Sequence, residues 1–281
     1  MRIAGHDIAV CDWSLRTASA AATAQLLNQV GLAWVQLGLG RLLGMDEAAR
    51  KQEVAALREA GIGITAGMIG FGGEDYSTIA MIRQTGGYVP DGAWEQRRQL
   101  TIDAGRLAKE IGLGMISTHV GFIPPSNHEK YPAILKRVAE VAQHLGEMGL
   151  VLLMETGQEK AAELLQFLND LPGNNVKVNF DPANMILYGA GDPIEAVEIL
   201  SRHIRHVHVK DAKLSDQPGV RWGEEVPFGT GQVNAKAFLR VLAEVGYDGP
   251  LAIEREAGDD RAADVRQAIA ALRAAAEGSG S

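Results

Sequence analysis

The feature that most limits how this chain can fold is a regular alternation of short β-like runs with longer stretches of helical period. Eight runs read as strands, at 7–13, 33–39, 62–70, 113–121, 150–156, 176–181, 205–211 and 251–256. Helical stretches lie between and after them, at 17–30, 46–60, 94–111, 131–148, 158–170, 192–201, 234–245 and 259–276. Strict alternation of this kind predicts parallel strands joined by crossover helices.

Eight such units without a glycine-rich dinucleotide loop fit a (β/α)8 barrel, or TIM barrel, better than a doubly wound sheet. The length of 281 residues also agrees with the usual size of that barrel, about 250 residues. No linker-like stretch divides the chain, so we expect an α/β fold with one barrel domain over 1–277. The final GSGS, 278–281, is expected to be a flexible tail outside the domain.

Composition argues against several classes of partner. Lys and Arg together number 27 against 35 Asp and Glu, a net charge of −8, which gives no electrostatic footprint for nucleic acid. No apolar run is long enough to span a bilayer, and no secretion signal precedes Asp7. The single cysteine, Cys11, fits a reducing compartment. We therefore expect a cytoplasmic protein that binds a small molecule, with no nucleic-acid or membrane partner, and that forms a homo-oligomer, a dimer or tetramer.

The stretch RHVHVKDA, residues 205–212, alternates like a strand. It places His206, His208 and Lys210 on one face, opposite Val207 and Val209. In a barrel both faces are buried, one against the helices and one in the lumen. We therefore expect the valines to point outward and the polar face to point inward.

The same alternation puts polar groups inward near the ends of other strands. They are Glu155, Asp181 beside Asn179, Glu254 beside Ala252, and His119 beside Ser117. Barrel enzymes keep their active sites at the carboxyl ends of the strands. Glu155, Asp181, His208 and Glu254 should meet there, and three carboxylates so close would raise one another's pKa values. A divalent cation removes that problem, and three oxygens with one nitrogen favour Mn²⁺ or Mg²⁺, with Co²⁺ as a further alternative.

Five segments together resemble a known family. METGQE (154–159), NFDPANM (179–185), HVHVKDA (206–212), FGTGQV (228–233) and IERE (253–256) are similar to the xylose-isomerase-like barrels. Within that superfamily they resemble the sugar isomerases and epimerases that include ketose 3-epimerases, hydroxypyruvate isomerases and inosose dehydratases, with the ketose 3-epimerase branch closest.

The resemblance implies a Mn²⁺-dependent isomerase that epimerises a ketose, free or phosphorylated, at C3. Carried over by position, Glu155, Asp181, His208 and Glu254 match the metal ligands, and the two glutamates would exchange the C3 proton through a cis-enediolate. Residues expected to bind substrate are Gln158, Glu159, Asn184, His119, His206 and Lys210. Two positions depart from the 3-epimerase pattern: Asn184 stands where those enzymes have a substrate-binding His, and Leu214 where they have an Arg. Both departures put the identity of the substrate in doubt more than the metal.

Several of these residues also have a purely structural reading. Asp181 precedes Pro182 and could cap a short helix. His206 could be a hydrogen-bonded lumen histidine, and Lys210 a surface lysine with a buried stem. The glycines of FGTGQV mark a tight loop before a helix, whose N-terminus could hold a phosphate or nothing. Tryptophans 13, 94 and 222 could lie in the core or stack on a sugar.

Alternatives also stay open for the whole protein. An aldose–ketose isomerase like the hydroxypyruvate isomerases, or an inosose-type dehydratase, could use the same metal site. A catalytically dead barrel acting as a binding protein is a third reading, which an intact four-ligand set disfavours. The segment 70–92 is long for a loop and has glycines at both ends, so we expect it to close over the substrate. Its alternative role is an insertion at an oligomer interface.

Overall fold

Eight parallel strands form a closed barrel in the computed structural model, which describes residues 1–277. They are β2 (His6–Cys11), β3 (Trp34–Gly38), β4 (Gly63–Met68), β5 (Met115–Thr118), β6 (Val151–Glu155), β7 (Val176–Phe180), β8 (Ile204–Val209) and β11 (Leu251–Ile253). Neighbours in sequence pair in parallel, and β11 pairs with β2 to close the ring. The predicted (β/α)8 fold is confirmed, whereas the predicted tail at 278–281 lies outside the described residues.

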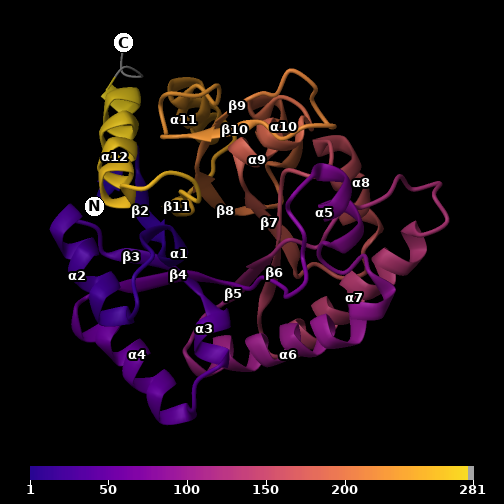
Figure 1. Cartoon of the computed structure of the whole chain (residues 1–281), viewed down its shortest axis with the longest axis horizontal. Helices are drawn as coiled ribbons and strands as arrows, with labels where there is room; N and C mark the ends of the chain where they lie inside the picture. Colours follow the sequence, from indigo (N-terminus) through magenta and orange to yellow (C-terminus); the bar gives the residue numbers. More distant parts are fainter. Residues whose placement is uncertain (278–281) are drawn as a thin grey trace.

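Helices surround this barrel (Figure 1). The crossover helices are α2 (Ala20–Val30), α4 (Glu47–Glu59), α6 (Trp94–Glu110), α7 (Tyr131–Glu147), α8 (Ala161–Asp170), α10 (Pro193–Leu200), α11 (Ala235–Glu244) and α12 (Arg261–Glu277). Several begin later than the sequence predicts because a side chain caps their first turn. Helix α2, for example, begins after Ser19, whose hydroxyl oxygen accepts a hydrogen bond from the Ala22 amide. None of the described helices combines the length and the apolar character needed to cross a membrane.

Further short elements, which the alternation does not predict, mostly follow the ends of barrel strands. They are α1 (Asp12–Leu15), α3 (Leu39–Leu43), α5 (Ile79–Thr85), the 3-10 turn η1 (Asp91–Ala93), α9 (Pro182–Tyr188) and the hairpin of β9 (Asp211–Lys213) with β10 (Glu224–Val226). A two-residue strand, β1 (Arg2–Ile3), pairs antiparallel with β2. The short elements after the strands enlarge the carboxyl-terminal rim of the barrel, where the candidate residues lie.

The inward and outward faces of the strands follow the predicted alternation. Val207 and Val209 belong to the large core between barrel and helices, whereas His206 and His208 hydrogen-bond to groups inside the lumen. A separate small cluster of Ala9, Cys11 and Ala252 fills part of the lumen, with Trp13 and Trp34 packed against it. Because this interior is packed, the barrel is open to a ligand only at its rim.

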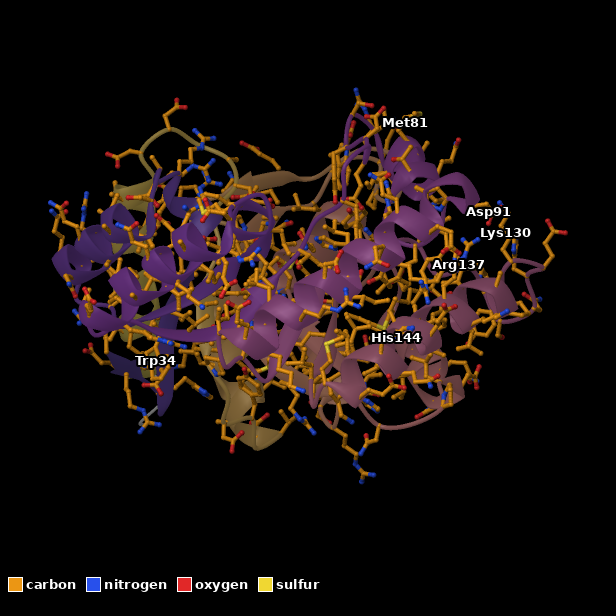
Figure 2. The ribbon with its side chains drawn as sticks, turned by 90° about the horizontal axis from the view of Figure 1, so that it is seen from below. Trp34, Met81, Asp91, Lys130, Arg137 and His144 are labelled. Carbon is orange, nitrogen blue, oxygen red and sulfur yellow. The ribbon has the colours of Figure 1, made fainter. Side chains whose placement is uncertain are left out.

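The segment 70–92 is tied to two helices of the wall. Arg97 on α6 is buried and donates hydrogen bonds to the carbonyl oxygens of Gly72, Thr85 and Gly87, at 3.0, 2.7 and 2.5 Å. Arg137 on α7 donates to the carbonyls of Tyr88 and Val89 and pairs with Asp91, which lies beside it in Figure 2. Both ends of the segment are therefore fixed, and its middle is held as well, because Glu74 Oε1 accepts from the Gly87 amide at 2.7 Å and Thr85 Oγ1 accepts from the Asp75 amide at 2.9 Å.

The glycine loop at 227–233 is organised around one carboxylate. Asp211, which is buried, accepts hydrogen bonds from the amides of Gly229, Gly231 and Val233 at 2.9–3.0 Å. A Cβ atom on Gly231 would lie 2.2 Å from an Asp211 oxygen, so only glycine fits there. These amides already have an anionic partner in the chain, and the loop therefore offers them to no phosphate.

Replacing Arg97 with methionine should loosen the 70–92 segment. The change removes the charged donor to three carbonyl groups, each such hydrogen bond being worth roughly 1.5–3 kcal/mol. We expect faster amide hydrogen exchange and faster proteolytic cleavage within 71–88. The matched control is Arg98→Met, which removes a part-exposed ion pair with Glu140 and a contact with His144 Nε2, neither of them with the 70–92 segment, and the ion pair should contribute about 1 kcal/mol or less. Equal protection of 71–88 in the two variants would contradict the anchoring role of Arg97.

Candidate metal centre

Four side chains predicted from separate strands do meet at the rim. Glu155 ends β6, Asp181 follows β7 directly, His208 lies on β8 and Glu254 follows β11. Each offers one ligand atom, and these atoms all lie within 4.8 Å of one another. All four are buried, with at most 5% of any of them exposed. The adjacency rests on the parallel register, because Ala252 of β11 is paired with His208 itself.

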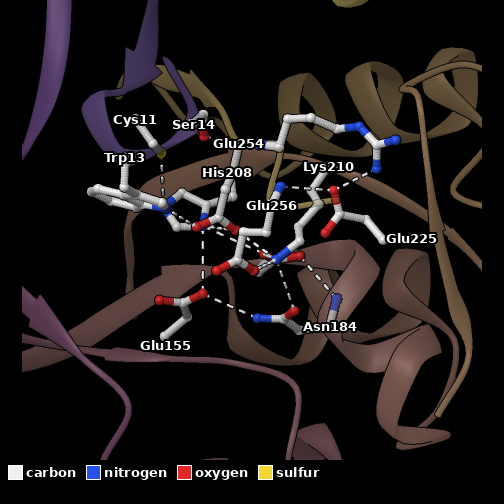
Figure 3. A network of polar contacts seen from close by, with 12 residues as sticks. Cys11, Trp13, Ser14, Glu155, Asn184, His208, Lys210, Glu225, Glu254 and Glu256 are labelled. Atoms are coloured by element: carbon white, nitrogen blue, oxygen red, sulfur yellow. Dashed lines mark hydrogen bonds and ion pairs between the residues drawn. The ribbon is translucent and has the colours of Figure 1, made fainter. Parts of the chain in front are cut away.

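The imidazole of His208 is the centre of the group (Figure 3). Its Nδ1 atom lies 3.5 Å from Glu155 Oε1, 3.4 Å from Asp181 Oδ2 and 3.3 Å from Glu254 Oε2. Three carboxylates thus face one ring nitrogen from three directions. Glu155 Oε2 is buried as well, and no described residue donates a hydrogen bond to it. Three buried carboxylate oxygens gathered around one ring nitrogen are a donor set that a hard divalent cation binds, so the residues fit such an ion and Glu155 Oε2 is left over.

The pKa values of Asp181, Glu254 and His208 are all shifted by burial and by the charges around them. Burial raises the pKa of Asp181 to about 6, although Lys210 opposes that rise. Burial also acts to raise the pKa of Glu254, but Lys210 and His208 outweigh it and hold that pKa well below its usual range. For His208, burial lowers the pKa, yet the surrounding carboxylates, led by Glu254, raise it well above its usual value. Lys210 and His208 therefore stabilise the charged form of Glu254 more than that of Asp181.

A second layer of side chains holds the glutamates in place. Trp13 Nε1 donates to Glu254 Oε1 at 2.8 Å, and Lys210 Nζ donates to Glu254 Oε2 at 2.8 Å (Figure 3). On the other side, Asn184 Nδ2 donates to Glu155 Oε1 at 3.0 Å. Both Asn184 and Lys210 thus lie at the site as predicted, in contact with the candidate ligands themselves. Lys210 is only 2% exposed, so it is not a surface lysine.

Asp181 has two structural functions at once. Its Oδ1 accepts from the Asn184 amide at 2.9 Å and caps α9, whereas its Oδ2 faces His208. The capping alternative from the sequence is therefore correct, and it does not compete with the metal-ligand reading. The cap instead fixes the rotamer that turns Oδ2 toward the site.

His119 and His206 occupy different positions relative to the four residues. His119 lines the cavity above them, with Nε2 3.5 Å from Glu155 Oε1. His206 is fully buried one layer lower, where its Nδ1 lies 2.8 Å from Asn179 Oδ1 and its Nε2 lies 3.0 Å from Thr65 Oγ1. The structure thus places His119 where a substrate could reach it, and His206 among lumen side chains.

The cavity above the four residues has a volume of about 510 Å³. Aromatic rings form much of its wall, from Trp13, Tyr76, Tyr188 and Trp222. Trp13 and Trp222, for which the sequence allows either a core position or contact with a ligand, both line this cavity, whereas Trp94 packs against Tyr88 and Arg137. Trp222 Nε1 also donates to the Tyr76 carbonyl at 3.1 Å, and the centroids of the Trp222 and Tyr188 rings lie 4.6 Å apart. The hairpin and the 70–92 segment therefore meet over the site.

Gln158 and Glu159 line a neighbouring cavity of about 650 Å³, although Gln158 Nε2 also donates at 3.3 Å to the hydroxyl of Tyr188 on the wall of the first cavity. The chain turns sharply after β6 at Gly157, where φ is +138° and a Cβ atom would lie 2.4 Å from Asn184 Cβ. Strand alternation stops at that turn, so it cannot place the residues beyond it. Glu159 Oε1 accepts the Ile123 amide at 2.9 Å and so fixes the loop after β5.

Fold and site together identify the family. The family model for the xylose isomerase-like TIM barrel matches residues 24–275. The chain belongs to this family. A solved structure of a xylose isomerase domain protein from Planctomyces limnophilus is 33% identical over 96% of each chain, with a TM-score of 0.88. A solved L-ribulose 3-epimerase, 17% identical over 97% of this chain and 95% of that one, has a TM-score of 0.72, which shows the shared barrel fold.

Curated relatives match over shorter stretches. An inosose dehydratase of Clostridium botulinum is 27% identical over 145 residues, which are 46% of this chain and 48% of that protein. The chain spans about half the length of the curated relatives of this kind that it matches. Membership of a family of barrels that includes sugar-modifying enzymes therefore rests on the family match and the structure, and the particular reaction does not follow from them.

Removing the divalent metal ion should destabilise the protein, because the carboxylates that bind it then repel one another. We expect a chelator-treated sample to melt roughly 5 °C or more below one saturated with Mn²⁺. Asp181→Ala and His208→Ala should abolish stoichiometric metal binding, measured by mass spectrometry of the metal content. Glu256→Gln is the control, since its half-exposed carboxylate contacts Lys210 and none of the four candidate ligands. Full metal content in both alanine variants would contradict the ligand assignment.

Replacing Glu159 with glutamine should change how stability depends on pH. Burial raises the pKa of Glu159 from 4.5 to about 8, so the folded protein resists ionising it while the unfolded chain does not. Wild type should therefore lose stability relative to Glu159→Gln as pH rises from about 4.5 to about 8, by of the order of 1–4 kcal/mol. Urea unfolding across that range tests this. A constant difference between the two proteins at every pH would refute it.

Proposed function

We propose that this protein is a divalent-metal-dependent isomerase that epimerises a ketose at C3. The observation that carries the proposal is the convergence of three buried carboxylates and one imidazole beneath a cavity of sugar size. Two of those carboxylates, on Glu155 and Glu254, belong to strands separated by β7 and β8 in the barrel. They can therefore approach a bound sugar from different sides, which a reaction that inverts one carbon requires.

Mn²⁺, Mg²⁺ or Co²⁺ held by Glu155, Asp181, His208 and Glu254 would supply Lewis-acid polarisation of the ketose carbonyl, which makes the adjacent C–H more acidic. Glu155 is suited to take that proton, because its Oε2 atom has no donor among the described residues. Asn184 holds the other oxygen of Glu155 and limits its rotation. His119 lies beside Glu155 on the cavity wall, where it can hydrogen-bond a sugar hydroxyl.

Glu254 has a different environment, in which both carboxylate oxygens already accept hydrogen bonds. Trp13 binds one oxygen and Lys210 the other, so the carboxylate is firmly oriented. In an epimerase it would return a proton to the opposite face of C3. Glu254 lines the cavity, so it can take that proton up from solvent, while Lys210, at 2.8 Å, keeps the carboxylate oriented.

The cavity favours a free ketose over a phosphate ester. No lysine or arginine is among the residues that line it, and the acids Glu74 and Glu256 are. The ammonium of Lys210 is already directed to Glu254, Glu256 and Asn184. A phosphate group would thus enter a cavity without an available cation, where like charges repel it. Aromatic walls suit the apolar faces of a neutral sugar.

A dehydratase is the second candidate, and the unequal surroundings of Glu155 and Glu254 are the observation that favours it. Loss of water from a polyhydroxy ketone needs a base for the C–H and an acid for the leaving hydroxyl. The unequal environments of Glu155 and Glu254 suit separate base and acid functions better than they suit two equivalent glutamates. The partial match to an inosose dehydratase agrees with this alternative.

Turnover in deuterated water distinguishes these reactions. The Mn²⁺-loaded protein is incubated with a panel of free ketoses, inososes and the matching ketose phosphates, and products are read by NMR and mass spectrometry. Deuterium at C3 with inversion supports epimerisation, whereas label only at C1 or C2 would indicate an aldose–ketose isomerase. Loss of one water would indicate a dehydratase.

Replacing Glu155 with glutamine should lower kcat by about 10²–10⁴-fold in the same assay, because the base that takes the proton is lost. Glu244→Gln, on the exposed surface of α11, is the matched control and should leave kcat unchanged. Near wild-type turnover by Glu155→Gln would exclude this residue as the base.

A further inference from the structure

Gln36 lies in the lumen of the barrel, on β3, far from the four candidate ligands in sequence. Its side chain is fully buried, and its Oε1 atom lies 2.7 Å from Nε2 of His208. Cys11 Sγ is near the same oxygen, at 3.4 Å. Gln36 does not line the cavity above the site, so a substrate does not reach it. Its partner is the back of the His208 ring.

The two nitrogens of His208 face different surroundings. Nδ1 faces the three carboxylates, whereas Nε2 faces Gln36 on the opposite edge of the ring. A nitrogen that binds a metal ion must present its lone pair, so the ring hydrogen has to sit on the other nitrogen. An amide oxygen only accepts hydrogen bonds. Gln36 Oε1 is therefore a partner that fits Nε2–H and leaves Nδ1 free for an ion.

Asn179 is the competing neighbour of the same nitrogen. Its Nδ2 atom lies 3.1 Å from His208 Nε2, while its Oδ1 atom is occupied by His206 Nδ1 at 2.8 Å. Asn179 consequently presents an N–H group, which favours a ring with its hydrogen on Nδ1. Without an acceptor at position 36, Asn179 would be the amide closest to Nε2, and the ring would present a hydrogen toward the carboxylates. Gln36 opposes that arrangement from the shorter distance.

Among the described residues, the other hydrogen bond of the Gln36 side chain is the one its oxygen accepts from Cys11 Sγ, which is a weak donor. The Nε2 atom of Gln36 is buried and has no hydrogen-bond partner among the described residues. A buried amide group without a partner costs stability. An apolar side chain would avoid that cost and pack as well beside Cys11. The retained amide is therefore accounted for by its oxygen, which contacts His208.

We propose that Gln36 is a positioning residue for the metal centre: its carbonyl accepts the hydrogen of His208 Nε2 and so directs the Nδ1 lone pair at the cation. The proposal rests on the metal site of the proposed function, and it adds a residue from the far wall of the barrel. Partners of this kind typically change metal affinity by about 10–100-fold when they are lost. Gln36→Met removes the acceptor at similar size, whereas Gln36→Glu keeps an acceptor in place.

The test measures Mn²⁺ binding to chelator-treated protein at fixed pH, by the electron spin resonance signal of the free ion. We expect Gln36→Met to bind Mn²⁺ about 10–100-fold more weakly than wild type, and Gln36→Glu to bind at least as well as wild type. Ser117→Ala is the control, because it changes another fully buried side chain on a barrel strand, whose hydroxyl has no hydrogen-bond partner among the described residues; its affinity should stay at the wild-type value. Thermal melting of the metal-free proteins separates lost affinity from lost folding.

A second measurement needs no variant. In ¹⁵N-histidine-labelled wild type loaded with diamagnetic Mg²⁺, the nitrogen shifts of His208 should show the hydrogen on Nε2. Hydrogen on Nδ1 in that state, or unchanged Mn²⁺ affinity in a folded Gln36→Met, would overturn the role of Gln36 and leave the proposed function standing. Failure of wild type to bind either ion would instead overturn the metal site and, with it, this proposal.

Discussion

Three carboxylates buried against one imidazole repel one another, and much of the carboxyl-terminal rim is built around that repulsion. Glu155, Asp181 and Glu254 cannot be diluted by water, because none is more than 5% exposed. Among residues 1–277, Lys210 is the fixed cation that contacts these acids, since His208 must be neutral to bind an ion. Together, a divalent ion and one ammonium group balance three negative charges. This balance explains why a lysine that is 2% exposed is tolerated beside Glu254.

The sequence predicts the direction of a side chain well where the residue lies in a strand or directly after it, and poorly where it lies farther beyond the end of the strand. Alternation along β7 and β8 placed Asp181 and His208 correctly, because backbone geometry sets the direction of each side chain. Gln158 and Glu159 follow a glycine at φ +138°, where that rule no longer applies, and they face a neighbouring cavity. The resemblance to the family predicts that these two residues bind substrate, but it contains no information about this turn.

Contacts across the barrel are the other part that the sequence could not supply. Gln36 reaches His208 from a strand that is not a neighbour in the sheet, and Trp13 reaches Glu254 across the barrel closure. Such pairs arise only when the ring of strands closes, and no local pattern marks them. Contacts between loops are equally hard to predict: the hydrogen bond from Trp222 to the Tyr76 carbonyl joins two loops that are far apart in the sequence. A lone glutamine on β3 gave no signal at all.

Asp211 acts toward the glycine loop as a ligand that is already bound. Its carboxylate is joined covalently to the chain, so its effective concentration at the amides of Gly229, Gly231 and Val233 far exceeds that of any anion in solution. The hairpin that begins at Asp211 and the turn that leads into α11 consequently behave as one mechanical unit. Trp222 is carried by that hairpin. Any movement that opens the roof of the cavity at Trp222 therefore either bends the hairpin between 213 and 224 or displaces the start of α11 with it.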